Sequence, residues 1–461
     1  MPIVSGVNGF VLAMAFSCGV AIAAAGSVPP RKFIAHGWDA LVVTPENILS
    51  NAAKFAAAGT DGVTVALPVR RQADGSLADY WNLPTDPEWQ YETFADQVPV
   101  LRQIVAHPGL GESFLLCAFS PMRGRMGFRD DAKWKRFAGN MRVLARLACE
   151  GGMRGLFLDN EDYCARRQYV LAADEGGFDE AYDLARQRGR EVFAGVFEEF
   201  PQAVILPFWL LTQVQSLLAT VDPVAEMRNT GSLWPAFVNG ILDVMPPTAV
   251  LVDGNEYAYQ YEAAKGDFAA SAADQMIGLL PLVVPENRAK YRSQVRVGFG
   301  LYLDMYVSDK ENSSWYFGPV NGSRLEHFRI NATEAARRAD EYVWLYGEQV
   351  SHIRWEGLAR QDLRFDPEVT WEDRLPGFAK ACAMAKDPAA AALPTGQGVA
   401  RDGLPALTMD ASWDTSQREL FISPPSWRED AFDTLDSTPY SWDVREFFTE
   451  GGPRRMLILI R

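Results

Sequence analysis

The chain contains little cysteine and histidine, with five Cys and four His among 461 residues. No C-x-x-C, H-x-H or H-E-x-x-H motif occurs, so neither a zinc ribbon nor a histidine-bound catalytic zinc is expected. Cys117, Cys149, Cys164 and Cys382 are widely spaced, which predicts core thiols with one possible bridge. The G-x-S-x-G and G-x-G-x-x-G motifs are also missing, which argues against a serine acyl-transfer triad and a dinucleotide fold. The sequence therefore predicts no bound metal and no cofactor.

Positive charge is also scarce. The chain has 44 basic and 59 acidic residues, which gives a formal net charge of -15. Such a charge repels the phosphates of nucleic acids and anionic membrane surfaces, so a polynucleotide partner is not expected. Beyond the first 27 residues no apolar run is long and unbroken enough to cross a bilayer. We therefore expect no membrane span in the mature chain.

Residues 1–27 form an uncharged, mostly apolar segment that ends near Ala23, Ala24 and Ala25. An apolar run followed by small residues is typical of a cleaved signal peptide and predicts a secreted or periplasmic protein. A buried or disordered N-terminal segment is the alternative, because no Lys or Arg precedes the apolar run. A lipoprotein is less favoured, since the residues before Cys18 match that signal only loosely.

Short strand-like runs alternate with longer helical patterns between residues 33 and 390, which favours repeated βα units and a parallel sheet. Helical spacing is clear after Thr44, from 131, from 178 and from 330. Eight strands predict an α/β protein with a (β/α)₈ TIM barrel over residues 28–392. Residues 393–461, rich in Pro, Asp and Ser, predict a C-terminal accessory segment that could form a small β-structure packed on the barrel. The predicted strands are 33–39, 62–68, 113–121, 155–163, 203–209, 248–257, 294–304 and 341–348.

The fourth predicted strand, GLFLDNEDY, carries the most informative pattern. Active sites of such barrels lie at the carboxyl ends of the strands. The alternation of side chains along a strand places Phe157, Asp159 and Glu161 on one face. The negative charge of Asp159 and partial burial would raise the pKa of Glu161, as a general acid requires. An ion pair with an arginine such as Arg154, or a loop cap, is the alternative interpretation.

Three other strand ends offer a carboxylate that could act with Glu161. Alternation along the seventh strand places Asp304 where Glu161 projects, and the eighth strand ends in Glu348. In the sixth strand Gly254 makes the alternation ambiguous, and we favour Glu256 over Asp253. Each of these carboxylates could instead form a buried ion pair or a loop cap.

Polar and aromatic side chains at the same ends suit a sugar, because apolar sugar faces stack on rings and hydroxyl groups need hydrogen-bond partners. Part of this set is expected to pack in the core. The candidate substrate-binding residues are His36, Trp38, Asp39, Asn160, Tyr163, Trp209, Asn255, Tyr257, Tyr302, Tyr306, Trp344, Tyr346 and Glu348.

GLFLDNEDY resembles the fourth-strand signatures of TIM-barrel glycoside hydrolases in two ways. Asp159, Glu161 and Tyr163 look like the end of the chitinase-type D-x-D-x-E-Y pattern, although Phe157 replaces its first Asp. Asn160 and Glu161 look like the Asn-Glu pair of the large retaining clan. That clan implies a nucleophilic Glu at the end of strand seven, where this chain has Asp304. The resemblance implies a glycosidase style and no particular family.

These observations predict a glycoside hydrolase that acts on an oligosaccharide or polysaccharide. Glu161 would be the general acid/base, Asp159 would tune it, and Glu256 or Asp304 would be the nucleophile or base. One alternative is a non-catalytic carbohydrate-binding barrel, whose carboxylates would be neutralised by Arg or Lys. Another is a metal-dependent hydrolase or lyase in which Asp159, Glu161 and Asp304 hold a divalent cation.

Overall fold

The computed structural model describes residues 31–121, 124–164, 166–356, 358 and 364–387, together with four strands between 410 and 460. The predicted signal peptide, residues 1–27, lies outside the described residues, as does the predicted boundary near 392. Among the helices that the structure describes, none is long and apolar enough to cross a membrane.

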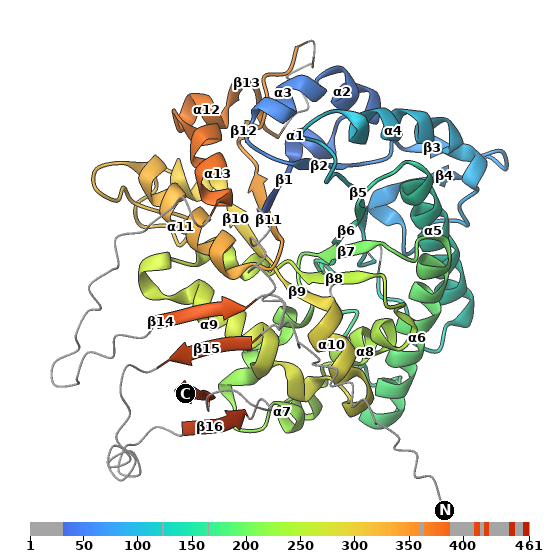
Figure 1. Ribbon diagram of the computed structural model, residues 1–461. Coiled ribbons are helices and arrows are strands. Elements are labelled where there is room, and N and C mark those ends of the chain that lie inside the picture. Colours follow the sequence, from blue (N-terminus) through green and yellow to red (C-terminus); the bar gives the residue numbers. More distant parts are fainter. Residues whose placement is uncertain are drawn as a thin grey trace, which may run out of the picture.

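The barrel consists of parallel strands in the order β10-β11-β1-β2-β5-β6-β7-β8-β9 (Figure 1). β9 and β10 are two halves of one strand, separated at Gly298, and they pair with β8 and β11 respectively. A Cβ atom at Gly298 would lie 2.7 Å from a Val252 methyl carbon, so only glycine fits this break. The eight predicted strands therefore close into the predicted (β/α)₈ barrel. Their bounds are β1 Lys32–Gly37, β2 Gly62–Val65, β5 Phe114–Ala118, β6 Gly155–Asp159, β7 Val204–Pro207, β8 Val250–Asp253, β9 Val295–Val297, β10 Phe299–Tyr302 and β11 Tyr342–Gly347.

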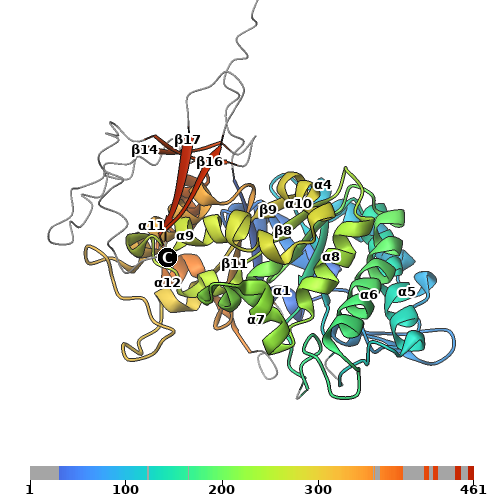
Figure 2. The ribbon, with the colours of Figure 1, turned by 90° about the horizontal axis from the view of Figure 1, so that it is seen from below.

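Helices surround the strands, and α5, α6 and α8 lie together on one side of the barrel (Figure 2). The helix predicted after Thr44 is split into α2 and α3, because Asn51 leaves helical geometry; Thr44 and Asn47 form a capping box at its start. The main helices are α2 Pro45–Ser50, α3 Ala52–Ala57, α4 Val98–Ala106, α5 Asp131–Glu150, α6 Phe178–Glu199, α7 Pro223–Thr230, α8 Trp234–Val244, α9 Asp267–Ala273, α10 Arg288–Gln294, α11 Arg324–Arg338 and α13 Phe378–Lys386.

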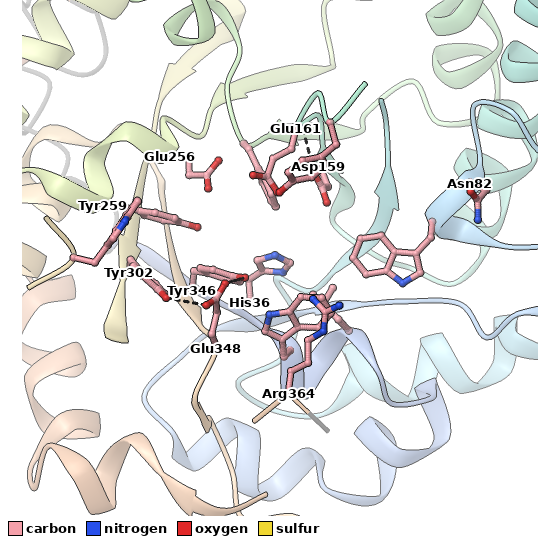
Figure 3. A pocket seen from close by; sticks show the side chains of 16 residues that line it. His36, Asn82, Asp159, Glu161, Glu256, Tyr259, Tyr302, Tyr346, Glu348 and Arg364 are labelled. Carbon is pink, nitrogen blue, oxygen red and sulfur yellow. Dashed lines mark hydrogen bonds between the residues drawn. The ribbon is translucent and has the colours of Figure 1, made fainter. Parts of the chain in front are cut away.

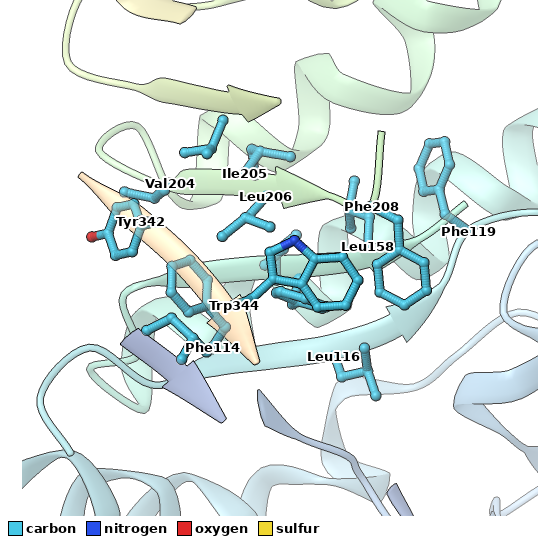
Figure 4. Close-up of a cluster of buried hydrophobic side chains, with 14 of the residues drawn as sticks. Phe114, Leu116, Phe119, Leu158, Val204, Ile205, Leu206, Phe208, Tyr342 and Trp344 are labelled. Atoms are coloured by element: carbon cyan, nitrogen blue, oxygen red, sulfur yellow. The ribbon is translucent and has the colours of Figure 1, made fainter. Parts of the chain in front are cut away.

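Large side chains fill the inside of the barrel (Figure 4). The Trp344 ring is fully buried and stacks on Phe208 at 4.9 Å between centroids. Phe157 packs edge-on against both rings. The Trp344 indole N–H donates to the Gly254 carbonyl at 2.7 Å, so the polar atom of this ring is satisfied. The lumen is thus a packed core, and a ligand can enter only at an end of the barrel.

Two antiparallel strand pairs lie in the C-terminal segment. β14 (Asp410–Asp414) pairs with β15 (Glu419–Ser423), and β16 (Trp442–Phe447) pairs with β17 (Arg455–Ile460). In the barrel, Cys117, Cys149, Cys164 and Cys382 are all free thiols, so the bridge that the sequence left open does not form among them.

Candidate active site

A cleft of about 960 Å³ opens at the carboxyl ends of the barrel strands (Figure 3). Because the strands are parallel, their ends bring together side chains from seven of the eight strands or the segments that follow them. The described residues that line the cleft are His36, Trp38, Leu41, Trp81, Asn82, Asp159, Glu161, Tyr163, Phe208, Glu256, Tyr259, Tyr302, Trp315, Tyr346, Glu348 and Arg364.

Asp159 ends β6, and Glu161 follows two residues later on the same side of the cleft. The Glu161 backbone N–H donates to Asp159 Oδ1 at 3.1 Å, which fixes the turn between them. Burial, with a further contribution from Glu161, raises the pKa of Asp159 to about 8. Burial also raises the pKa of Glu161, and the Glu348 charge adds to this while the Tyr163 hydroxyl opposes it. The sequence attributed the raised pKa of Glu161 to partial burial and to the Asp159 charge. Burial is confirmed as the largest cause, whereas the charge that adds to it is that of Glu348.

Glu256 begins the 3₁₀ turn Glu256–Gln260 after β8. Asn255 before it adopts a left-handed backbone with φ 41°, and this bend turns the chain so that Glu256 lines the cleft. Burial, followed by the charges of Glu161, Asp159 and Glu348, raises the pKa of Glu256 to about 9. Its Oε2 is buried and has no hydrogen-bond partner among the described residues.

Asp253, the alternative to Glu256 in the sixth strand, is fully buried below the cleft. Its carboxylate accepts the backbone N–H groups of Leu210 and Thr212, each at 2.9 Å, and the Thr212 hydroxyl. Asp253 therefore holds the turn after β7 in place, and Glu256 is the sixth-strand carboxyl that the cleft exposes.

Glu348 follows β11 and is held by two tyrosines (Figure 3). The Tyr302 hydroxyl donates to Oε2 at 2.9 Å and the Tyr346 hydroxyl donates to Oε1 at 2.8 Å. Burial raises the pKa of both phenols, so they remain protonated and act as donors. These two hydrogen bonds fix the position of the Glu348 carboxyl group at the edge of the cleft.

Asp304 does not project beside Glu161, and that prediction was wrong. β10 ends at Tyr302 and a 3₁₀ turn, Leu303–Tyr306, follows, so the strand alternation does not extend to residue 304. Asp304 is buried, where it accepts the backbone N–H groups of Glu348 at 2.7 Å and Gln349 at 3.1 Å. Burial raises its pKa to about 6. It anchors the backbone of Glu348 and does not line the cleft.

The floor of the cleft includes His36, whose ring stacks on Tyr346 at 5.4 Å. Burial, with a smaller contribution from His352, lowers the pKa of His36 to about 3, so its imidazole is neutral. Its Nδ1 lies 2.9 Å from the Thr64 hydroxyl, which fixes the ring. A neutral, fixed imidazole can bond a sugar hydroxyl without adding charge.

Aromatic rings form one wall. Trp38 stacks on Trp81 at 6.2 Å, and the Arg364 guanidinium lies 4.2 Å from the centre of the Trp38 ring. The sequence analysis did not single out Arg364 or Asn82. Asn82 ends the short 3₁₀ turn Tyr80–Asn82, and Arg364 lies outside any helix or strand, so neither belongs to a periodic pattern and only the folded chain brings them to the cleft.

Several predicted substrate-binding residues lie outside the cleft because buried partners hold them. Asp39 accepts the His352 backbone N–H, Asn255 donates to the Ser271 hydroxyl, and Asn331 donates to the Tyr306 hydroxyl. Trp344 lies below the floor in the core. These side chains position the strand ends, so the prediction that they contact substrate does not fit the fold.

Asn160 and Trp209 are also absent from the cleft wall. The Asn160 side chain bonds both the N–H and the carbonyl of Trp209, at 3.3 and 2.9 Å. Trp209 and Tyr257 line a second pocket of about 640 Å³, which shares Glu161 and Tyr163 with the cleft.

The carboxyl groups of the cleft have no paired cation among the residues that the structure describes. In the part of the chain that the structure describes, no Lys or Arg forms an ion pair with Asp159, Glu161, Glu256 or Glu348. Arg154, suggested as a partner for Asp159 or Glu161, instead pairs with Glu112 and Glu341. Within the same described residues, no group of three or more His, Cys, Asp or Glu side chains is arranged to hold a metal ion.

No known protein family and no curated protein matches the sequence. Among solved structures, the chain is similar to an endo-1,4-β-mannanase from Rhizomucor miehei, at 8% identity over 77% of this chain and 98% of that one, with a TM-score of 0.45. A β-mannanase from the blue mussel Mytilus edulis aligns at 11% identity over 78% and 96%, with a TM-score of 0.38. A sugar phosphate isomerase/epimerase from Parabacteroides distasonis aligns at 11% over 81% and 98%, with a TM-score of 0.33. At these identities the likeness concerns the barrel fold alone.

Proposed function

We propose that this protein is a glycoside hydrolase in which Glu161 is the general acid/base and Glu348 is its ionised partner. One observation carries the proposal. The two carboxyl groups line the same cleft, and their surroundings differ. Burial raises the pKa of Glu161, while two phenol groups donate to Glu348. Glycosidic bond hydrolysis needs one protonated and one charged carboxyl group on either side of the scissile bond.

The reaction follows from these roles. Glu161 gives its proton to the glycosidic oxygen as the bond between that oxygen and the sugar carbon breaks. Glu348 either attacks the sugar carbon or takes a proton from the water that attacks it. In the first case water then breaks the bond between Glu348 and the sugar carbon and gives a proton to Glu161; in the second, Glu348 releases its proton to solvent and Glu161 takes one up. In both cases water supplies the hydroxyl group of the new sugar end.

Asp159 and Glu256 act here as neutral groups. Burial raises the pKa of Asp159 to about 8 and that of Glu256 to about 9, so both carry a proton at neutral pH. A protonated carboxyl group can donate to a sugar hydroxyl, and Oε2 of Glu256, which has no partner within the described chain, is available for such a bond. Asp159 positions Glu161 by accepting its backbone N–H.

The walls of the cleft suit a carbohydrate. Trp38, Trp81 and Trp315 offer flat apolar faces, and Trp315 is 47% exposed. His36, Asn82 and Arg364 supply polar groups beside those rings. Rings that flank a few fixed polar groups match the apolar faces and the hydroxyl groups of a sugar.

Export of the protein is part of the proposal. The uncharged apolar run within residues 1–27 supports it. N-terminal sequencing of the protein recovered outside a producing bacterial cell would locate the cleavage, expected after the alanines at 23 to 25. Recovery of the whole chain inside the cell would contradict export.

The test is a screen of polysaccharides and chromogenic glycosides with the wild-type protein and Glu161→Gln. We expect kcat of the variant to fall by about 10³-fold or more on the active substrate, with KM changed by only a few fold. The Tm should stay at the wild-type value because Glu161 holds no structural ion pair in the described chain.

Glu112→Gln is the matched control, since Glu112 lies in an ion-pair cluster away from the cleft. It should hydrolyse the same substrate at the wild-type rate. Full activity of Glu161→Gln would exclude Glu161 as the acid. Failure of the wild-type protein to hydrolyse any of the sugars would contradict the proposed function.

A further inference from the structure

A second pocket adjoins the cleft, and Glu161 lies at the division between them. The pocket has a volume of about 640 Å³, which is enough for a small-molecule site. Glu161 and Tyr163 line both spaces. The remaining side chains of the pocket come from the loop after β6, the turn after β7, the start of α8 and the turn after β8. They are Asp162, Cys164, Arg167, Tyr169, Val170, Trp209, Gln213, Val214, Ser232, Trp234 and Tyr257.

The division between the two spaces is held in place. Asp162, next to Glu161, accepts the backbone N–H groups of Cys164 at 3.2 Å and Gln168 at 2.6 Å. The Cys164 thiol donates to the Pro121 carbonyl at 2.6 Å. These contacts fix the segment that carries Glu161, so its carboxyl group stays between the cleft and the second pocket.

An aromatic wall of the second pocket is tied to the same segment. Trp209 packs on Tyr257 with 5.5 Å between ring centroids, and Tyr257 is 42% exposed. Asn160, which precedes Glu161, bonds both the N–H and the carbonyl of Trp209. Asn160 is therefore a positioning residue that sets the distance between the proton donor and this wall. Arg167, Gln213 and Ser232 add polar groups around the rings.

The placement of the carboxyl groups gives the two spaces different roles. Glu348 lines the cleft and not the second pocket. The sugar that is attacked must contact Glu348, so it lies in the cleft. The oxygen that leaves must lie at Glu161, so whatever is attached to that oxygen extends beyond Glu161.

We infer that the second pocket binds the leaving sugar, so that the substrate is an oligosaccharide or polysaccharide and not the glycoside of a small alcohol or phenol. The inference rests on the proposed function. One sugar unit stacks on Tyr257 in the second pocket while its neighbour occupies the cleft, and the bond between them lies at Glu161.

The test compares leaving groups in variants of each space. The probes are oligosaccharides of glucose, mannose or N-acetylglucosamine, from disaccharide to hexasaccharide, and the glycosyl fluoride of each sugar. Fluoride is a leaving group that does not fill the second pocket. We expect Tyr257→Ala to lower kcat/KM for the oligosaccharides about tenfold more than for the fluoride. Trp315→Ala, which alters the cleft, should lower both by similar factors.

Leu77→Ala is the control, because Leu77 is exposed and lines neither space. It should behave as the wild type on every probe. Tyr257→Leu, which keeps apolar bulk without a ring, should repeat the effect if Tyr257→Ala does not fold. Equal losses on both probes, or no loss on either, would overturn the inference and leave the proposed function standing. A wild-type protein that hydrolyses no probe would overturn both.

Discussion

The two ends of the barrel differ in whether their carboxyl groups lie beside a cation. At the amino ends of the strands Glu112 lies 2.7 Å from the Lys32 ammonium and 3.3 Å from Arg154. Glu341 lies 2.7 Å from the same lysine. Asp61 lies 2.9 Å from Lys386. At the carboxyl ends, Asp159, Glu161, Glu256 and Glu348 line one cleft without such a cation among the described residues.

This difference separates groups that stabilise the fold from groups that are available for chemistry. A paired carboxylate is stabilised in its charged form by its cation, and the ion pair adds modestly to the stability of the native state. Unpaired, buried carboxyl groups cost stability and shift their pKa instead, as Asp159 and Glu256 do. Such a cost is typical of an active site, where groups are kept in the protonation state that the reaction needs.

The largest expected effect comes from Glu348→Gln at the carboxyl end. The variant loses the charged group that the proposed reaction requires, so kcat should fall by about 10³-fold or more. Steady-state kinetics on the active glycoside, with Tm measured in parallel, checks this. A variant that keeps its activity would show that Tyr302 and Tyr346 hold Glu348 for structure alone.

A smaller effect in stability is expected at the amino end from Glu112→Gln. Lys32 and Arg154 would each lose a partner, so the free energy of unfolding should fall by roughly 1 kcal/mol. Denaturant unfolding measures this loss, and kcat/KM should stay at the wild-type value. A loss of activity without a loss of stability would contradict the view that carboxyl groups at the amino ends stabilise the fold and only those at the carboxyl ends serve the reaction.

The last effect is expected in the pH dependence of stability, through Glu256→Gln. The pKa of Glu256 is raised from 4.5 to about 9 in the folded chain. Between these values the folded state binds a proton that the unfolded state has lost, so the free energy of unfolding falls as pH rises and levels off above about pH 9. Glutamine cannot ionise and escapes this loss.

The Tm of Glu256→Gln should therefore exceed the wild-type Tm by about 2 °C or more at pH 9, and the gain should vanish near pH 4. Calorimetry across this pH range measures the difference, with Glu112→Gln as the comparison that shows no such gain. A gain that is the same at every pH would mean that Glu256 is charged in the folded protein.

Much of the barrel was predictable because its signals are local. Alternation along GLFLDNEDY correctly put Phe157 in the lumen and Asp159 in the cleft. The strand-end positions of Tyr346 and Glu348 followed from the same alternation. The prediction for Asp304 was wrong because a strand pattern cannot show where the strand stops, and a 3₁₀ turn begins at Leu303.

Other parts of the candidate site depend on contacts between distant segments. Arg364 meets Trp38 across more than three hundred residues, and Asn160 bonds Trp209 from the next strand. Asp39, Asn255 and Tyr306 were predicted to bind substrate. Instead they form buried hydrogen bonds, with His352, Ser271 and Asn331 respectively. No pattern within one segment carries these pairings.

The sequence by itself determined the eight strands, the parallel barrel and the strand ends at which carboxyl groups gather, because side-chain alternation and βα order are properties of neighbouring residues. The tertiary structure decided which carboxyl groups share the cleft and what surrounds each of them. Burial at Glu161 and Glu256 and the two phenols at Glu348 come from separate strands. A pKa depends on everything that surrounds a group, and those surroundings exist only once the barrel has closed.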